Sequence, residues 1–122
     1  MASREQVARF IGSSFRSVWS LEVLLLLKRD PRPWTHEAIV AALRASDLIV
    51  TQSLDALAAA GLVAQDKGGA ASYRPVSPSD AEMVEAAERF YLQSPDAVRR
   101  IILGTFASGL TEFADAFRLR KD

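Results

Sequence analysis

Side chains able to do chemistry are few in this chain, and none has the spacing of a catalytic or metal-binding motif. The single histidine, His36, has Glu37 beside it rather than one helical turn away, so the pair forms neither a metal-ligand pattern nor a histidine relay. Gly68-Gly69 lacks the Lys-Ser/Thr of a phosphate-binding loop, and Ser13-Ser14 lacks the glycines of a nucleophile elbow. We therefore expect no enzymatic activity, no metal and no cofactor.

A run of carboxylates between residues 80 and 88 invites a catalytic interpretation. Its spacing is helical, and Arg89 follows directly, which is typical of a solvated helix face rather than of a pair of catalytic acids. The run comprises Asp80, Glu82, Glu85 and Glu88. This pattern predicts a solvent-exposed helix face and no active site.

Composition limits the chain to one domain. With 122 residues, 49% of them hydrophobic and 25% charged, it can bury a real core but has no room for a second, so we assign residues 1–122 to a single domain. Fifteen basic residues balance fifteen acidic ones. A strongly basic nucleic-acid-binding protein would instead have a clear excess of basic residues.

Two features bear on location. The absence of cysteine excludes disulfides and thiolate sites and fits a reducing compartment. The apolar run at residues 23–27 is too short to cross a bilayer, and the N-terminus lacks a signal-peptide pattern. We expect a cytoplasmic protein that does not enter a membrane.

The first half of the chain predicts three short helices. Apolar residues recur at helical spacing from about residue 4, and Ser17 can cap a second, almost wholly apolar helix that ends at the prolines Pro31 and Pro33. Thr35 can cap a third helix that ends near Arg44. The inner positions of the first and third helices are Val7, Phe10, Ile11 and Phe15, and Ile39, Val40 and Leu43.

The next segment predicts a fourth helix and a hairpin. Ser46 can cap the helix, Gly61 can end it, and its inner face carries Val50, Leu54, Leu57 and Ala58. Two short strands flank a glycine turn at residues 68–71. Helices beginning after Ser77 and Ser94 are expected to reach about residues 93 and 118.

This order resembles bacterial winged helix-turn-helix regulators, such as the multiple-antibiotic-resistance and arsenical-resistance repressors. The resemblance covers residues 17–75 and rests on the capped helices 35–44 and 46–60, the exit at Gly61-Leu62-Val63 and the hairpin with Tyr73-Arg74. It implies a mostly α fold with a small β-hairpin, extended by N- and C-terminal helices. It also implies a DNA-binding transcriptional regulator, whereas winged helices in general serve protein interaction too.

The resemblance assigns DNA contacts to the fourth helix and the hairpin. Gln52 and Thr51 occupy groove-facing positions, and Gln can pair with adenine. Leu48 and Ile49 share those positions but fit a thymine methyl or a partner protein equally well. Base reading by this helix and a plain amphipathic core helix remain open. The same segment has no Lys or Arg and carries Asp47 and Asp55, which opposes phosphate binding.

Phosphate contacts are expected from cations on the hairpin and near the helix ends. The hairpin supplies Lys67 and Arg74, and Asp66 offsets one of them. Arg44 lies at the turn between the third and fourth helices. Further candidates are Arg16, Lys28, Arg29 and Arg32, for each of which plain surface charge is the alternative.

The C-terminal helix, residues 95–118, carries a long apolar stripe. It includes Ile102, Phe106, Leu110, Phe113 and Phe117, more than a hairpin alone can cover. We expect these residues to form a homodimer interface, which would supply two half-site readers for a palindromic operator. The alternative is that the helix packs on Val7, Phe10 and Phe15 of its own chain. The expected partners are therefore double-stranded DNA, a second copy of the chain, or another protein.

Overall fold

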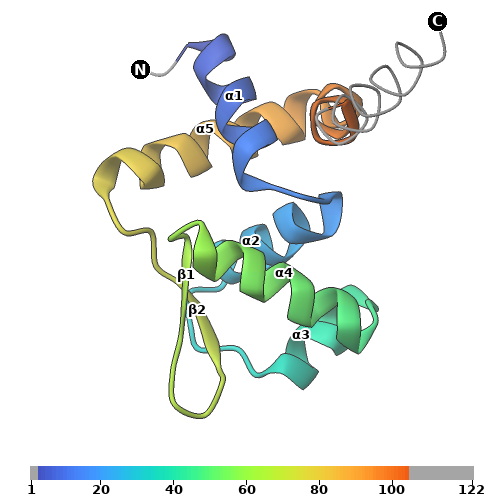
Figure 1. Ribbon diagram of the computed structural model, residues 1–122, viewed down its shortest axis with the longest axis vertical. Coiled ribbons are helices and arrows are strands. Elements are labelled where there is room, and N and C mark those ends of the chain that lie inside the picture. Colours follow the sequence, from blue (N-terminus) through green and yellow to red (C-terminus); the bar gives the residue numbers. More distant parts are fainter. Residues whose placement is uncertain (1–2, 105–122) are drawn as a thin grey trace, which may run out of the picture.

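The computed structural model describes residues 3–104, a mostly helical chain with one small antiparallel sheet (Figure 1). A further helical stretch covers residues 95–104, so the start of the predicted last helix is confirmed, while its continuation lies outside the described residues. The elements are α1 (Arg4–Ser14), α2 (Val18–Arg29), α3 (His36–Leu43), α4 (Asp47–Ala59), β1 (Val63–Gln65), β2 (Ala71–Tyr73) and α5 (Pro78–Gln93).

Each of these helices begins at a side chain that caps it. The hydroxyl of the capping residue accepts a hydrogen bond from the backbone N–H three residues later, which satisfies a group that the helix itself leaves unpaired. The caps predicted from sequence, Ser17, Thr35, Ser46 and Ser77, all act in this way. Ser3 adds a fifth, with Gln6 completing a capping box.

The turn between α3 and α4 is as tight as the sequence predicted. Arg44 takes the left-handed conformation, with φ 54° and ψ 37°, Ala45 is buried, and Ser46 already caps α4. A left-handed backbone is unfavourable for a residue with a Cβ atom, so the turn holds Arg44 in a strained conformation.

The end of α4 follows from Gly61. Its φ is 76°, and the N–H groups of Gly61 and Leu62 donate to the carbonyls of Ala58 and Leu57, as in a Schellman motif. A Cβ atom at Gly61 would meet the Val76 side chain at 3.1 Å. Only glycine therefore fits where the chain leaves α4 for β1.

The hairpin pairs with a third segment that sequence did not predict as extended. β1 and β2 are antiparallel, with Val63 opposite Tyr73. Trp34, just before α3, forms a bridge to Ala71 in β2 through two backbone hydrogen bonds of 2.8 Å each. The N–H of the Trp34 indole also donates to the Asp30 carbonyl. The hairpin is thereby tied to the start of α3.

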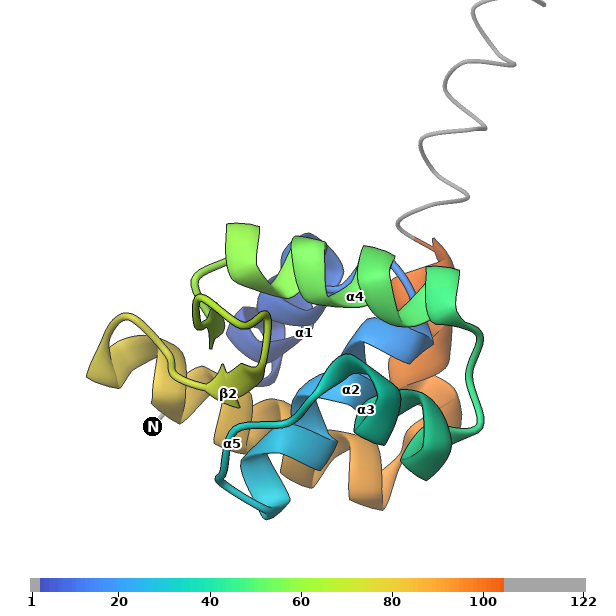
Figure 2. The same ribbon diagram turned by 90° about the horizontal axis from the view of Figure 1, so that it is seen from below.

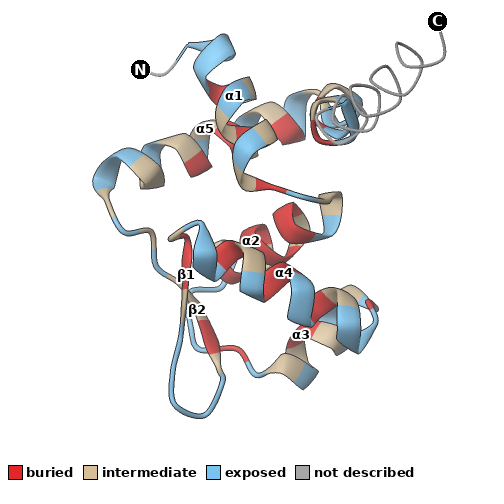
Figure 3. Cartoon of the chain, in the orientation of Figure 1, coloured by how far each residue is buried: buried red, intermediate tan, exposed pale blue. Residues whose placement is uncertain are grey.

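The core lies around α2, which is the central helix as predicted. Figure 2 shows α4 and α5 on opposite sides of α2, and Figure 3 shows buried residues concentrated where the helices face one another. Leu21, Val23, Leu24, Leu25 and Leu27 of α2 are each at most 1% exposed. Within residues 3–104 no single helix is long and apolar enough to cross a membrane, and the pair α1–α2, which together has that length, is bent by 105°.

Polar contacts fasten α5 to α2. The Lys28 Nζ and Arg29 Nε atoms lie 2.7 Å and 3.0 Å from the two carboxylate oxygens of Glu88, and the Tyr91 hydroxyl donates to Glu22. Partial burial alone would raise the pKa of Glu88, but the hydrogen bonds and charges of Lys28 and Arg29 outweigh it and hold that pKa below its ordinary value. The predicted acidic face of α5 is thus partly an interhelical contact rather than wholly solvated.

Candidate recognition surface

The inner face of α4 agrees with the sequence prediction except at one position. Val50, Leu54 and Leu57 are at most 2% exposed and pack against α2. Ala58 was predicted on the same face but is exposed, whereas Ser53 is buried. The buried stripe therefore runs through 50, 53, 54 and 57, and position 58 has turned past it towards solvent.

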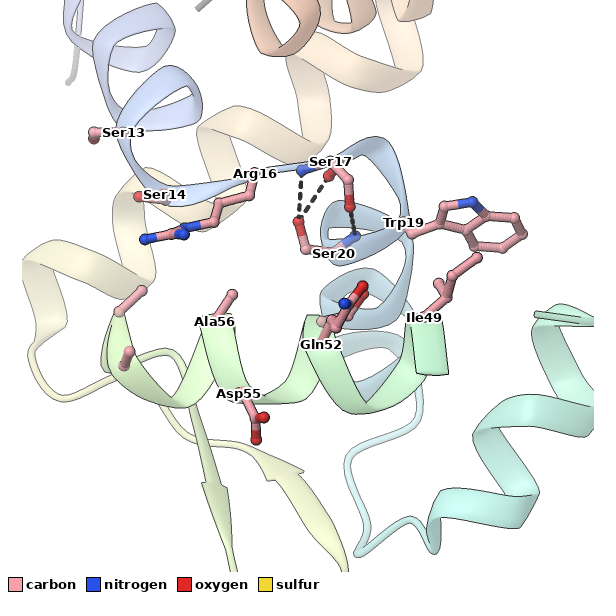
Figure 4. Close-up of a pocket in the computed structure, with 13 residues that line it drawn as sticks. Ser13, Ser14, Arg16, Ser17, Trp19, Ser20, Ile49, Gln52, Asp55 and Ala56 are labelled. Carbon is pink, nitrogen blue, oxygen red and sulfur yellow. Dashed lines mark hydrogen bonds between the residues drawn. The ribbon is translucent and has the colours of Figure 1, made fainter. Parts of the chain in front are cut away.

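The four residues assigned to base reading do not share one face. Leu48 is 64% exposed and lies on the outer side with Thr51, whose hydroxyl donates to the Asp47 carbonyl at 3.0 Å. Ile49 and Gln52 instead line a groove on the flank of α4, and Ile49 is half-buried there (Figure 4). Asp55 points away from that groove. The outer side of α4 therefore presents an aliphatic residue, a hydroxyl and a carboxylate.

The predicted phosphate-contacting cations divide into two groups. Lys28 and Arg29 are bound to Glu88, and Arg32 is paired with Asp30 at 2.8 Å and stacked over Trp34 at 3.9 Å. Within residues 3–104, no ion pair or hydrogen bond engages the side chains of the other four: Arg16, Arg44, Lys67 and Arg74. The structure thus pairs three of the seven candidates with carboxylates.

The charge around α3, α4 and the hairpin is slightly negative. Residues 34–76 contain the carboxylates Glu37, Asp47, Asp55 and Asp66 but only the cations Arg44, Lys67 and Arg74. The Asp66 carboxylate accepts hydrogen bonds from the N–H groups of Gly68 and Ala70, so it also shapes the hairpin turn. A phosphate backbone gains little electrostatic attraction from such a surface.

A groove of about 760 Å³ runs along the flank of α4, between this helix and the segment joining α1 to α2 (Figure 4). Trp19 and Ile49 stand beside each other at one end, and Arg16 extends above Ala56 towards the other. The remaining lining residues are Ser13, Ser14, Ser17, Ser20, Gln52, Ser53, Asp55, Ala59 and Ala60. The sequence did not predict this groove, because its two walls, residues 13–20 and 49–60, are far apart in the chain.

Two residues of the groove have an exposure that the sequence did not indicate. Trp19 is 38% exposed on α2, where the surrounding hydrophobic run suggested that most of the circumference was buried. Ser53 is only 4% exposed, yet its hydroxyl has no hydrogen-bond partner among residues 3–104. A serine among inner positions could have marked this place, since a hydroxyl on an otherwise apolar face indicates contact with solvent or with a polar group.

The predicted dimer interface is described only at its first residue. Ile102 is 2% exposed and belongs, with Val98, to the same core cluster as Val7, Ile11 and Phe15. The assignment of Ile102 to an intermolecular contact is therefore wrong, because this side chain is already covered by its own chain. Phe106, Leu110, Phe113 and Phe117 lie outside the described residues.

Two polar residues at the starts of α3 and α4 lie close together. His36 and Asp47 are the first residues of α3 and α4, and the His36 Nε2 atom lies 2.7 Å from Oδ1 of Asp47. The contact lacks hydrogen-bond geometry, so it is an ion pair only when the imidazole is protonated. No cluster of three potential metal ligands occurs among residues 3–104.

Comparison with known protein families, with curated proteins and with solved structures finds no match to this chain.

Proposed function

We propose that this chain is a winged helix-turn-helix protein whose α4 surface recognises another protein. The fold assignment is supported by the order α2, α3, α4, hairpin, by the short capped turn at Arg44, and by the bridge from Trp34 to β2. This isolated bridge ties the hairpin to the segment just before α3.

The charge of α4 is the observation that favours a protein over DNA. The helix that would enter the major groove carries two carboxylates and no cation, and its outer side presents Leu48 at 64% exposure. Carboxylates facing phosphates oppose binding, while an exposed aliphatic side chain next to polar groups is ordinary at the centre of a protein interface. α4 therefore suits a protein partner better than a duplex.

Sequence-specific DNA binding in transcriptional control is the second candidate. Its support is the helix-turn-helix order together with three unpaired cations around it, Arg44, Lys67 and Arg74. In this function Gln52 would discriminate a base, and a homodimer formed through the apolar residues 106–117 would present two copies of α4 to a palindromic site.

Salt dependence separates the two functions. The protein is passed over random genomic fragments at low salt, and binding is then measured as salt is raised. A DNA reader retains some fragments above background, and Lys67→Ala or Arg74→Ala each lowers the slope of log K against log salt by about one unit. We expect no enrichment and no such change of slope.

Recognition of a protein is tested by placing a photo-crosslinking amino acid at position 48. Cross-linking in the native cell should give a discrete adduct that is lost on Asp55→Lys, which reverses one charge on the outer side of α4. Asp80→Lys, on α5, is the matched control and should leave the adduct intact. Enrichment of specific DNA fragments together with absence of any adduct would reject the proposal in favour of DNA binding.

A further inference from the structure

We propose that the groove between α4 and the α1–α2 segment binds an extended peptide of a partner protein, in which an apolar side chain precedes a carboxylate by about three residues. This inference rests on the proposed function and specifies where and by what chemistry the partner is held. Figure 4 shows the groove with Trp19 and Ile49 at one end and Arg16 along its upper wall.

The length of the groove fits an extended chain. Its α4 wall runs from Ile49 to Ala60, which at the rise of an α-helix corresponds to about 16 Å. Five residues of extended peptide cover about that distance. The groove is open along one side rather than enclosed, and this shape suits a segment of polypeptide better than a small molecule, most of whose surface must be buried.

The apolar end supplies an anchor site. Trp19 is 38% exposed, and it lines the groove together with the half-buried Ile49 (Figure 4). An apolar side chain placed there would shield the Trp19 ring from water, and burial of aromatic surface is a main source of interface affinity. This end therefore selects an aliphatic or aromatic residue.

The other end supplies a positive charge without a partner. Nothing among residues 3–104 pairs with the Arg16 guanidinium, and Asp55, the only carboxylate lining the groove, points away from it (Figure 4). From Ile49 to Ala56, below Arg16, is about 10 Å along α4, or three residues of extended chain. Arg16 therefore selects a carboxylate, which guanidinium binds with paired hydrogen bonds.

The groove also offers hydrogen bonds for a peptide backbone. The hydroxyls of Ser17 and Ser20 are already engaged in capping α2, with a Ser20 Oγ to Ser17 carbonyl distance of 2.7 Å. Ser53 is different, because it is 4% exposed, lines the groove and has no partner among the described residues. A bound amide group could replace water as the hydrogen-bond partner of this hydroxyl, which reaches the groove.

The experiment uses fluorescein-labelled heptapeptide pools and the full chain. In one pool position 2 is Leu, Ile or Phe and position 5 is Glu, and in the other pool position 5 is Lys, with Ser and Gly elsewhere. Fluorescence polarisation reports binding of each pool, and Trp19 emission reports contact with the apolar end. Trp34 is buried and hydrogen-bonded, so its emission should not respond.

We expect the Glu pool to bind at least about ten-fold more tightly than the Lys pool. Arg16→Glu should reverse this preference, because it exchanges the sign of the charge that the peptide meets. Arg9→Glu makes the same change of net charge at an exposed position outside the groove and should leave the preference unaltered. Ser53→Ala should weaken binding several-fold without lowering the melting temperature.

Equal binding of the two pools, or equal effects of Arg16→Glu and Arg9→Glu, would overturn the peptide site. So would displacement of the bound peptide by double-stranded DNA at low salt, which would assign Arg16 to a phosphate. Failure here differs from failure of the proposed function: if the adduct formed at position 48 persists while the peptide pools do not bind, a partner is recognised by the outer side of α4 and not by the groove.

Discussion

The cations of this chain have different surroundings on the two sides of α2. On the α5 side, Lys28 and Arg29 are bound to Glu88, and the neighbouring stretch 95–104 places Ile102 in the core. On the α4 side, Arg16 and Arg44 have no ionic partner among residues 3–104. The two cations at the end of α2 are thus paired within the chain, whereas those that flank α4 are available to a partner.

The difference shows why the number of cations is a poor guide to DNA binding. A balanced total charge can still leave a positive face if the carboxylates gather elsewhere. Here the reverse holds, because the α5 carboxylate Glu88 neutralises two cations while Asp47 and Asp55 stay on α4. The α4 side therefore has no excess of positive charge, because its own carboxylates offset its cations.

The largest effect should come from the α5 side. Ile102→Asp would place a carboxylate in a site that is 2% exposed, at a cost of several kcal/mol, and we expect the chain to lose its cooperative thermal transition. Leu103→Asp is the matched control, since Leu103 is 61% exposed. Similar melting curves for the two variants would mean that residues 95–104 do not pack on the core.

Light scattering of the unaltered chain at micromolar concentration should give a dimer, with residues 106–117 as the proposed contact.

The buried face of α4 should give the next largest effect. Leu57→Ala removes a side chain that is fully buried against α2 and should lower the free energy of unfolding by about 2–5 kcal/mol. Gln52→Ala, in the groove, should change it by less than about 0.5 kcal/mol. Urea unfolding measures both. Equal losses of unfolding free energy would show that Gln52 contributes as much to packing as Leu57, which would contradict this orientation of α4.

Glu88→Gln should release the cations of the α5 side. The neutral amide cannot hold Lys28 and Arg29 equally well, so we expect a loss of about 1–3 kcal/mol in unfolding free energy. The freed positive charge should also increase retention on non-specific DNA at low salt. Glu82→Gln, which changes the net charge equally on an exposed α5 residue, should do neither. No gain in DNA retention over that control would show that the pairing does not mask a positive surface.

The same contact should make stability sensitive to acid. The pKa of Glu88 is lower in the folded chain than its ordinary value of 4.5, so the carboxylate stabilises the fold above that pH. The contribution should disappear as the pH falls from about 4.5 through the lowered pKa. Glu88→Gln should flatten the pH dependence in this window. Parallel curves for the two proteins, measured by urea unfolding between about pH 6 and pH 3, would contradict this assignment.

The smallest effect should come from the turn on the α4 side. Arg44→Gly relieves a left-handed backbone at a residue with a Cβ atom, so stability should rise slightly, by up to about 1 kcal/mol. Ala42→Gly, in the exposed part of α3, should instead lower it by about 1 kcal/mol. Because Arg44→Gly also removes an unpaired cation, it tests DNA binding without risk of unfolding. A destabilised Arg44→Gly would show that its side chain has a packing role.

The sequence by itself determined the local structure, because that structure depends on neighbours within a few positions. Ser17, Thr35, Ser46 and Ser77 begin their helices as predicted, since a capping hydroxyl needs only the N–H group three residues later. Gly61 ends α4 because the backbone there requires a positive φ. Two short strand-like segments on either side of Gly68-Gly69 likewise sufficed to predict the hairpin.

Only the tertiary structure decided what those elements present to a partner. The pairing of Lys28 and Arg29 with Glu88 joins positions about 60 residues apart, and no local pattern records it. Ile102 is buried in one core cluster with residues of α1, at the other end of the chain. The groove exists because the α1–α2 segment lies beside α4. Gln52 therefore lines the groove while Thr51 lies on the outer side of α4, and the Ser53 hydroxyl has no hydrogen-bond partner among the described residues. Exposure and charge pairing belong to surfaces that distant segments form together. They therefore depend on how the other helices pack around α2 and not on the sequence of α2 itself.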